Sequence, residues 1–373
     1  MLNLSDIIGQ SQAVERLRAN LAAGRMPHAF CFAGPDGVGR ETTARALAGA
    51  LLCESPATDL TGESASCGLC EGCRMMRADA HPDFQLVYKE LARFHEDASV
   101  RSRVMQDLGI DVIRDFLIAP ACRSSTRGRG KVFVVLEADL LSIAAQNALL
   151  KTLEEPPAGV TIILICRRPE QLLPTTRSRC SLVRFGPLPR EFVTGKLAEA
   201  GVESAEAEFW ASFTDGSVGR ALELAKAGLY EIKRSVVEGL SALPAEGDAK
   251  FAEELAKIAD TLAEAEVKRA KKEDDANLSK MLAARRASGA MLEIMAAAYR
   301  DALGLAAGAN TPPVHADQLP AVQNIARRFS PVELADILEQ LSRYERLLWR
   351  NVNPKIVWDN VAITCASALP MNA

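Results

Sequence analysis

The first half of the chain alternates short apolar runs with stretches of helical periodicity. Three runs, at residues 28–33, 132–136 and 160–166, are rich in Val, Ile, Leu and Phe, and a polar or Gly/Pro-containing turn follows each. Buried strands have this composition, and strands that alternate with helices form parallel sheets covered by helices. The pattern therefore predicts an α/β domain with a parallel sheet from about residue 6 to residue 187.

A helix is expected between the last two of these runs. Ser142 can cap its N-terminus, and Pro156-Pro157 ends its pattern because proline cannot continue a helix. Its predicted apolar stripe consists of Ile143, Ala144, Leu149, Leu150 and Leu153. This segment therefore has the order strand, helix, strand.

The second half of the chain has the pattern of helices alone. From residue 188 the strand signals stop, and Ala, Leu, Glu and Lys recur at helical spacing. A Gly-Ser-Val-Gly break lies at 216–219, and a charged stretch at 268–280 has no apolar face. We expect the stretch 268–280 to be a solvated helix or a hinge. Asn353-Pro354 marks a further helix boundary.

Length and charge limit the possible classes of protein. At 373 residues the chain exceeds the usual size of one domain, so two or three domains are expected. Its net charge of −4 argues against a surface devoted as a whole to nucleic acid. The N-terminus lacks the pattern of a signal peptide, and no apolar run approaches the roughly 18 residues that cross a bilayer. A cytoplasmic protein without a membrane contact is predicted.

A glycine-rich turn follows the first predicted strand. Residues 34–42 are Gly-Pro-Asp-Gly-Val-Gly-Arg-Glu-Thr, and a helical pattern continues over 43–52. The spacing is that of a P-loop, whose glycines let backbone N–H groups curl around phosphates, while a lysine neutralises charge and a Ser or Thr hydroxyl holds Mg²⁺. The candidate nucleotide-binding residues of this loop are Gly34, Gly37, Gly39, Arg40, Glu41 and Thr42.

Two positions in this loop depart from the motif. Arg40 stands in place of the lysine and keeps its charge on a bulkier, planar group. Glu41 stands in place of the Ser or Thr. A carboxylate about 4 Å from a phosphate oxygen repels it by roughly 1 to 4 kcal/mol at effective dielectric constants between about 80 and 20. The loop therefore keeps the shape of a P-loop with impaired chemistry.

The second element of a nucleotide site is also altered. It should be a strand that ends in Asp-Glu, where the Asp helps to hold Mg²⁺ and the Glu orients the attacking water. Here Leu136 occupies the position of the Asp, and only Glu137 remains. The sequence therefore favours an inactive ATP site. The alternative is an active site in which Asp139, three residues further along the chain, takes the place of the missing Asp.

Four of the nine cysteines are clustered in sequence. Cys53, Cys67, Cys70 and Cys73 have the spacing C-x13-C-x2-C-x2-C, with glycines inside the tight turns. Four thiolates suit a closed tetrahedral Zn²⁺ site, and because no position stays open, such a zinc is structural rather than catalytic. The alternative, four merely reduced cysteines, is disfavoured because the surrounding segment is polar. We therefore predict a structural zinc ion.

An arginine-containing turn follows the third predicted strand. Residues 174–180 are Pro-Thr-Thr-Arg-Ser-Arg-Cys. An arginine held at such a domain edge can stabilise the charge of phosphoryl transfer in a neighbouring subunit, although a single arginine is more often a surface charge. The surrounding motifs favour the first alternative.

Taken together, the motifs resemble the clamp-loader subunits of bacterial DNA polymerase III, which are AAA+ proteins. The resemblance rests on Ile8-Gly9-Gln10, the altered P-loop, the four-cysteine insert, residues 146–157 (Gln-Asn-Ala-Leu-Leu-Lys-Thr-Leu-Glu-Glu-Pro-Pro) and Ser178-Arg179-Cys180. It covers about the first 225 residues strongly. It implies an α/β AAA+ P-loop domain over 1–187 with a zinc-binding insert at 53–73, an all-α lid over 188–229 and an all-α collar for oligomerisation over 230–373.

The resemblance also assigns residues. Arg179 matches an arginine that projects into the ATP site of the adjacent gamma subunit, Arg220 matches the second-sensor position, and Cys166 stands where active relatives carry a polar first-sensor residue. The four clustered cysteines match the zinc ligands. The basic residues Arg123, Arg127, Arg129 and Lys131 either face DNA in the assembled ring or form a solvated loop.

The implied function is that of a subunit that helps to open the sliding clamp and load it on primed DNA. Its partners are then gamma/tau-type and delta-type subunits in a hetero-pentameric ring, with the clamp and primer-template DNA bound by the assembled complex. The altered P-loop favours the delta-prime type, which belongs to a DNA-directed DNA polymerase (nucleotidyltransferase) holoenzyme without hydrolysing ATP itself. The alternatives are an ATP-hydrolysing gamma/tau-type subunit and a DNA-binding module that acts outside a ring.

Overall fold

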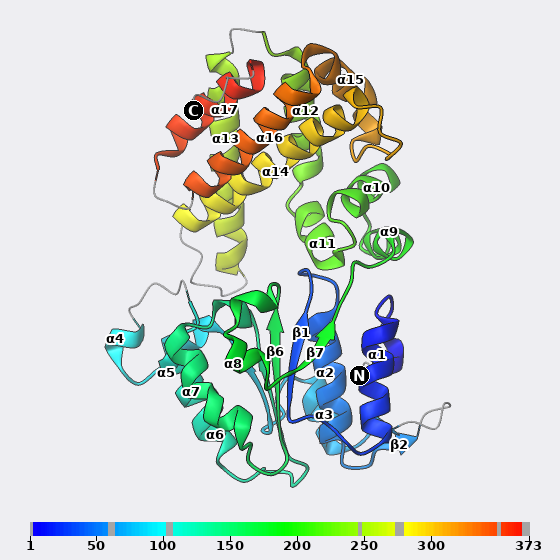
Figure 1. The fold of residues 1–373 in the computed structure, drawn as a ribbon, viewed down its shortest axis with the longest axis vertical. Helices are drawn as coiled ribbons and strands as arrows, with labels where there is room; N and C mark the ends of the chain where they lie inside the picture. The colour runs from blue at the N-terminus through cyan, green and yellow to red at the C-terminus, as the bar shows by residue number, and fades with distance from the viewer. Residues whose placement is uncertain are drawn as a thin grey trace. The chain divides into compact units, whose positions relative to one another are not determined.

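A computed structural model gives the fold of the chain and describes residues 3–58, 64–101, 107–244, 248–272, 280–348 and 352–367. The chain divides into two compact units, Met1–Pro189 and Arg190–Ala373 (Figure 1). The first contains a parallel sheet and the second is all helical, which confirms the predicted fold class.

The first unit is built on a five-stranded parallel sheet with the order β4-β5-β6-β1-β7. Its strands are β1 (Ala29–Ala33), β4 (Phe84–Val87), β5 (Lys131–Val135), β6 (Val160–Cys166) and β7 (Ser181–Arg184). The three predicted strands are confirmed as the central ones. The edge strands β4 and β7 were not predicted, because each has only four residues and mixes polar with apolar side chains.

Helices cover both faces of the sheet. In chain order they are α1 (Ser11–Ala22), α2 (Arg40–Leu52), α3 (Glu71–Arg77), α4 (Ala98–Arg101), α5 (Ile110–Ile113), the π-helical turn η3 (Arg114–Ile118), α6 (Ala119–Ala121), α7 (Ile143–Glu154) and α8 (Pro174–Arg177). Short 3-10 turns are η1 (Leu4–Asp6), η2 (Lys89–Phe94), η4 (Ala138–Leu140) and η5 (Pro169–Gln171), and β2 (Ala57–Thr58) pairs with β3 (Ser64–Ala65). Helices α1, α2 and α3 lie on the side of the sheet opposite α5, α6 and α7 (Figure 1).

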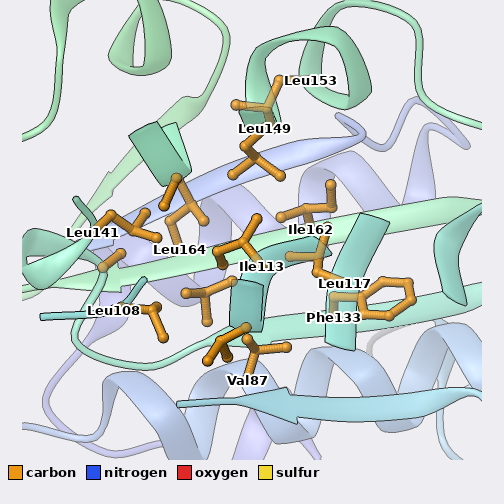
Figure 2. Close-up of a cluster of buried hydrophobic side chains, with 14 of the residues drawn as sticks. Val87, Leu108, Ile113, Leu117, Phe133, Leu141, Leu149, Leu153, Ile162 and Leu164 are labelled. Carbon is orange, nitrogen blue, oxygen red and sulfur yellow. The ribbon is translucent and has the colours of Figure 1, made fainter. Parts of the chain in front are cut away.

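A hydrophobic core fills the space between the sheet and the helices α5 to α7. Figure 2 shows its central side chains, which are fully or almost fully buried: Val87, Leu108, Ile113, Leu117, Phe133, Leu141, Leu149, Leu153, Ile162 and Leu164. Alternate residues of β5 and β6 contribute to this face, as expected for strands whose side chains alternate between the two faces. The core fixes the sheet on which the candidate site is carried.

The predicted helix between β5 and β6 is confirmed as α7, with one correction. The Ser142 hydroxyl accepts a hydrogen bond from the N–H of Ala145 at 3.2 Å, as a capping residue should. Ile143 and Ala144, however, are exposed and do not belong to the apolar stripe. The first turn of α7 extends beyond the packed core, so its buried face begins only at Ala145 and continues with Leu149 and Leu153.

The second unit consists of helices. They are α9 (Arg190–Glu199), α10 (Ser204–Phe213), α11 (Val218–Lys226), α12 (Leu229–Ala242), α13 (Ala249–Lys272), α14 (Lys280–Ala306), α15 (Leu319–Arg328), α16 (Pro331–Leu348) and α17 (Pro354–Ala366), with the 3-10 turn η6 (Ala316–Gln318) before α15. Asn353 caps α17 by accepting the N–H of Lys355 at 3.0 Å, at the boundary predicted from Asn353-Pro354. Helix α13 runs to Lys272, and residues 273–279 of the charged stretch lie outside the described residues.

An ion pair joins α12 to η6 inside this unit. The Lys233 side chain is fully buried, its ammonium contacts the Asp317 carboxylate, and it lies 4.1 Å from the centre of the Phe209 ring. Another pair, in which both side chains are buried, joins His315 Nδ1 to Asp301 at 2.8 Å. Among the helices that the structure describes, none combines the length and the apolar character needed to span a bilayer.

Candidate functional site

The candidate nucleotide site lies where β1, β5 and β6 end. These strands are neighbours in a parallel sheet, so the loops at their carboxyl ends meet at one edge, which is where ligands bind in such sheets. The glycine-rich loop follows β1 and leads directly into α2. Gly39 is the N-cap of this helix with φ +96°, and a Cβ on Gly34 would overlap the carbonyl oxygen of Phe185. Glycine is therefore required at both positions.

The charge of Arg40 is neutralised within the loop itself. Helix α2 begins at Arg40, three residues earlier than predicted, and the Arg40 side chain is buried. Its Nη2 contacts the carboxylate of Asp36, the third residue of the loop, and the other oxygen of Asp36 lies 3.0 Å from Nε of Arg167 at the end of β6. Asp36 thus bridges two arginines at the place where a P-loop would hold phosphate.

Glu41 is engaged outside the loop. Its carboxylate accepts a hydrogen bond from Nε of Arg45 at 2.8 Å, one turn along α2, and Arg45 also contacts Asp79. Thr42, the third candidate, is exposed, while the neighbouring Thr43 is buried and donates its hydroxyl to the carbonyl of Gly39 at 2.8 Å. No hydroxyl therefore replaces the metal ligand at the position of Glu41.

The acidic residues that follow β5 are bound by other groups of the chain. Glu137 follows the strand with φ +49°, and its carboxylate lies 3.2 Å from the ammonium of Lys89. Asp139, the residue considered for a shifted register, accepts the backbone N–H of Arg167 at 3.1 Å. Leu136 offers no ligand atom. Both acidic groups at this edge are therefore held by basic or N–H donors of the chain.

Cys166, the candidate for the first-sensor position, is buried in a pair of thiols. Sγ of Cys166 lies 3.3 Å from Sγ of Cys31 on the neighbouring strand β1. The contact with the Cys31 thiol and burial raise the pKa of Cys166 far above its ordinary value, so it stays protonated. Burial likewise raises the pKa of Cys180 to about 12. These thiols are packed groups without a polar function toward a phosphate.

The two remaining candidate arginines lie in different units. Arg179 follows α8 in the first unit, where its Nη1 donates to the carbonyl of Thr175 at 2.8 Å and its Nη2 contacts Glu154. Arg220 lies on α11 in the second unit, where it pairs with Glu293 of α14. Arg220 also lines a cavity of about 290 Å³ in that unit, together with Phe213 and Arg300.

The four clustered cysteines converge on one point. Their sulfur atoms all lie within 4.8 Å of one another, with Cys53–Cys70, Cys67–Cys73 and Cys53–Cys73 separations of 3.8, 3.9 and 3.7 Å. A tetrahedral ion with metal–sulfur bonds of about 2.3 Å would separate its ligands by about 3.8 Å. The arrangement is therefore compatible with a structural zinc ion.

Backbone donors point at the same sulfur atoms. The N–H groups of Cys67, Cys70 and Cys73 donate to Sγ of Cys53, Cys67 and Cys70 at 3.3, 3.3 and 3.4 Å. Backbone hydrogen bonds lower the pKa of Cys67, and against the effect of burial they lower that of Cys70 to about 6, whereas burial raises that of Cys53 and Cys73. Because four neighbouring thiolates repel one another, all four can ionise together only around a cation.

The basic loop before β5 contacts the cysteine region. Arg127 forms an ion pair with Glu54, the residue after Cys53, and Lys131 donates to the carbonyl of Pro120 at 2.8 Å. Asp83 holds this loop by accepting the backbone N–H of Arg127 at 2.8 Å. Two of the four basic residues considered for DNA contact are thus bound within the chain.

Several residues of the site were missed in the sequence. Asp36 lies within the predicted loop and Arg167 directly follows a predicted strand, but nothing in the order of residues indicates that they meet. Gln10 was noted only as part of a motif. Its buried side chain donates to the carbonyls of Val38 at 3.1 Å and Gly186 at 2.7 Å, and so ties the glycine-rich loop to the chain after β7.

Comparisons with known proteins give two matching family models and one solved structure that aligns over most of the chain. Residues 9–189 match the family model described as DNA polymerase III, delta subunit, and residues 256–364 match that described as DNA polymerase III, delta subunit, C terminal. A gamma subunit-related protein of DNA polymerase III from Thermotoga maritima, of known crystal structure, aligns over 96% of this chain and 100% of its own, with 17% identity and a TM-score of 0.42.

Curated relatives are similar to part of the chain. The DNA polymerase III subunit delta' of Escherichia coli strain K12 is 35% identical over 63% of this chain and 65% of its own. That of Pseudomonas aeruginosa is 31% identical over 58% of this chain and 61% of its own, so the match spans less than two thirds of either relative. The tau subunit from Escherichia coli is 34% identical over 52% of this chain and 27% of its own. The chain therefore belongs to the DNA polymerase III delta' family.

Proposed function

We propose that this protein is a subunit of the assembly that opens the sliding clamp and loads it on primed DNA, and that it does not hydrolyse ATP itself. The observation that carries the proposal is the neutralised loop: Arg40 is bound by Asp36, and Glu41 stands where a metal-binding hydroxyl is needed. The carboxylates of Asp36 and Glu41 repel a phosphate in this loop. Glu41 also takes the place of the hydroxyl that holds Mg²⁺ in a P-loop, and hydrolysis requires that Mg²⁺. The subunit would act in the cytoplasm as part of the polymerase holoenzyme.

In the same proposal Arg179 serves as an arginine finger for a neighbouring subunit. It follows a short helix at the edge of the first unit, and 33% of its side chain is exposed. An arginine supplied from a neighbour stabilises the charge that develops in phosphoryl transfer. The neighbours would be gamma/tau-type and delta-type subunits in a hetero-pentameric ring, joined through a collar formed by residues 230–373, with residues 188–229 as a lid.

We also assign a structural Zn²⁺ ion to the four-cysteine cluster. The fit rests on the sulfur separations of 3.7 to 3.9 Å and on the backbone N–H donors that stabilise thiolates. Four sulfur ligands complete the coordination of zinc, so the ion would hold the segment between Cys53 and Cys73 and take no part in chemistry. Metal analysis of the purified chain should find one zinc ion per molecule.

The decisive experiment compares ATP turnover in two samples. The purified chain alone should show no Mg²⁺-dependent turnover, and a complex reconstituted with gamma/tau-type and delta-type subunits, clamp and primed DNA should hydrolyse ATP. In that complex Arg179→Ala should lower turnover by about a hundredfold or more, as loss of an arginine finger does. Arg177→Ala is the matched control, since Arg177 is an exposed arginine two residues away. Equal turnover for Arg179→Ala and Arg177→Ala would refute the finger.

One observation favours a second candidate, a gamma/tau-type subunit that binds nucleotide itself. Nη1 of Arg40 is buried without a hydrogen-bond partner among the described residues, and a phosphate oxygen would satisfy it. ATP turnover by the chain alone that disappears in Arg40→Ala would establish this candidate in place of the first.

A further inference from the structure

An ion pair joins the end of α7 to the turn that carries Arg179. Glu154 is the last residue of α7, and its Oε1 contacts Nη2 of Arg179, while Nη1 donates to the carbonyl of Thr175 at 2.8 Å. The two side chains are 47% and 33% exposed. The guanidinium is therefore held on two sides and open to solvent elsewhere.

The backbone at both ends of this pair is anchored. The buried amide of Gln146 on α7 accepts the N–H of Leu173, the residue before α8, at 2.7 Å and donates to the carbonyl of Leu141 at 3.0 Å. On the other side of Arg179, Ser181 begins β7 and pairs with Phe30 of β1. The distance between Glu154 and Arg179 is therefore fixed by packed elements and does not depend on a flexible loop.

Glu154 is unfavourable for the helix in which it lies. The C-terminal end of a helix carries partial negative charge, which favours basic residues there and disfavours carboxylates. Glu154 ends α7, and Glu155 follows it as the C-cap. The helix itself gains nothing from a carboxylate at this position, and the described partner that compensates it is Arg179.

We propose that Glu154 is a positioning residue for Arg179. The inference rests on the proposed function, in which Arg179 reaches the nucleotide of a neighbouring subunit. A free arginine side chain has many rotamers and must be ordered when it meets a phosphate, whereas Glu154 and the Thr175 carbonyl order it beforehand. Nη1 also donates to Oγ of Ser178 at 3.4 Å, so these contacts engage at most three of the five N–H donors of the guanidinium and leave the others for phosphate oxygens. Glu154 acts through Arg179 and touches no substrate.

The test measures steady-state ATP hydrolysis by the reconstituted complex. Glu154→Gln should lower kcat by roughly three- to tenfold, as a misplaced catalytic group does, and leave KM for ATP unchanged because the neighbour's own residues bind the nucleotide. Glu154→Asp, which keeps the charge, should retain more of the rate. Glu155→Gln, the adjacent exposed carboxylate, is the matched control and should behave as the unmodified chain does. In an Arg179→Ala background, Glu154→Gln should have no further effect.

The outcomes separate this inference from the proposal beneath it. If Arg179→Ala lowers turnover while Glu154→Gln leaves kcat unchanged or raises it, Arg179 is a finger that Glu154 does not position, and the inference alone is overturned. If Arg179→Ala has no effect, both fail. A fall in kcat that accompanies weaker complex assembly or a lower melting temperature for Glu154→Gln would mark a structural role and also overturn the inference.

Discussion

Removing the negative charge of Asp36 should restore part of the phosphate affinity of the glycine-rich loop. Asp36 contacts Nη2 of Arg40 and lies 3.0 Å from Arg167, so it occupies both cations that a phosphate at this edge would use. The variant Asp36→Asn keeps the size of the side chain and removes only its charge. A phosphate oxygen could then accept hydrogen bonds from Arg40 without facing a carboxylate.

The expected gain follows from the geometry. A phosphate oxygen seated on the Arg40 guanidinium would lie about 4 Å from the Asp36 carboxylate, where two unit charges repel by about 1 kcal/mol in water and about 4 kcal/mol near a protein surface. The Asp36 side chain is 55% exposed, which favours the lower half of this range. About 1 to 2 kcal/mol corresponds to a roughly 5- to 30-fold lower Kd.

The assay is an equilibrium titration of the full chain with a fluorescent ATP analogue, with and without Mg²⁺. The gain should be present without Mg²⁺, because it comes from removing the repulsion between the Asp36 carboxylate and the phosphate. Asp36→Glu, which keeps the charge, is the control, and Arg40→Ala combined with Asp36→Asn should lose the gain. Equal affinities for Asp36→Asn, Asp36→Glu and the unmodified chain would refute the argument that the loop neutralises its own arginine.

Two further predictions concern the stability of each unit. Asp317→Asn should destabilise the second unit by about 3 kcal/mol in urea unfolding, because it leaves the fully buried Lys233 without a counter-ion, and Lys233→Met in the same chain should recover most of the loss. Burial raises the pKa of Asp317, but hydrogen bonds from Lys233 and Tyr230 outweigh it and hold this pKa below its ordinary value. The stabilisation by the Asp317 carboxylate is therefore fully present above the ordinary pKa and is lost as the pH falls through the folded-state pKa. A difference in stability between Asp317→Asn and the unmodified chain that does not change with pH would contradict this. Cys73→Ser should lower the zinc content measured by metal analysis and expose the segment around Cys53 to protease, whereas Cys122→Ser, at an exposed cysteine outside the cluster, should change neither.

Local patterns in the sequence predict much of this protein. The central strands, the helical second half, the glycine-rich loop and the cysteine spacing each depend on residues a few positions apart, where backbone geometry and side-chain periodicity act directly. The same holds for the caps of α7 and α17 by Ser142 and Asn353. These features follow from the chain alone because their physical causes are local.

Only the tertiary structure decided which charged groups of the candidate site pair with each other. Arg167 and Asp36 are 131 positions apart, and Glu154 and Arg179 meet only because α7 and α8 pack together, so neither ion pair has a periodic signal. The edge strands β4 and β7 are likewise defined by their neighbours rather than by their own composition. The sequence determined which chemical groups this protein carries. Folding determined which of them neutralise each other, because electrostatic partners depend on distance in space and not on separation along the chain.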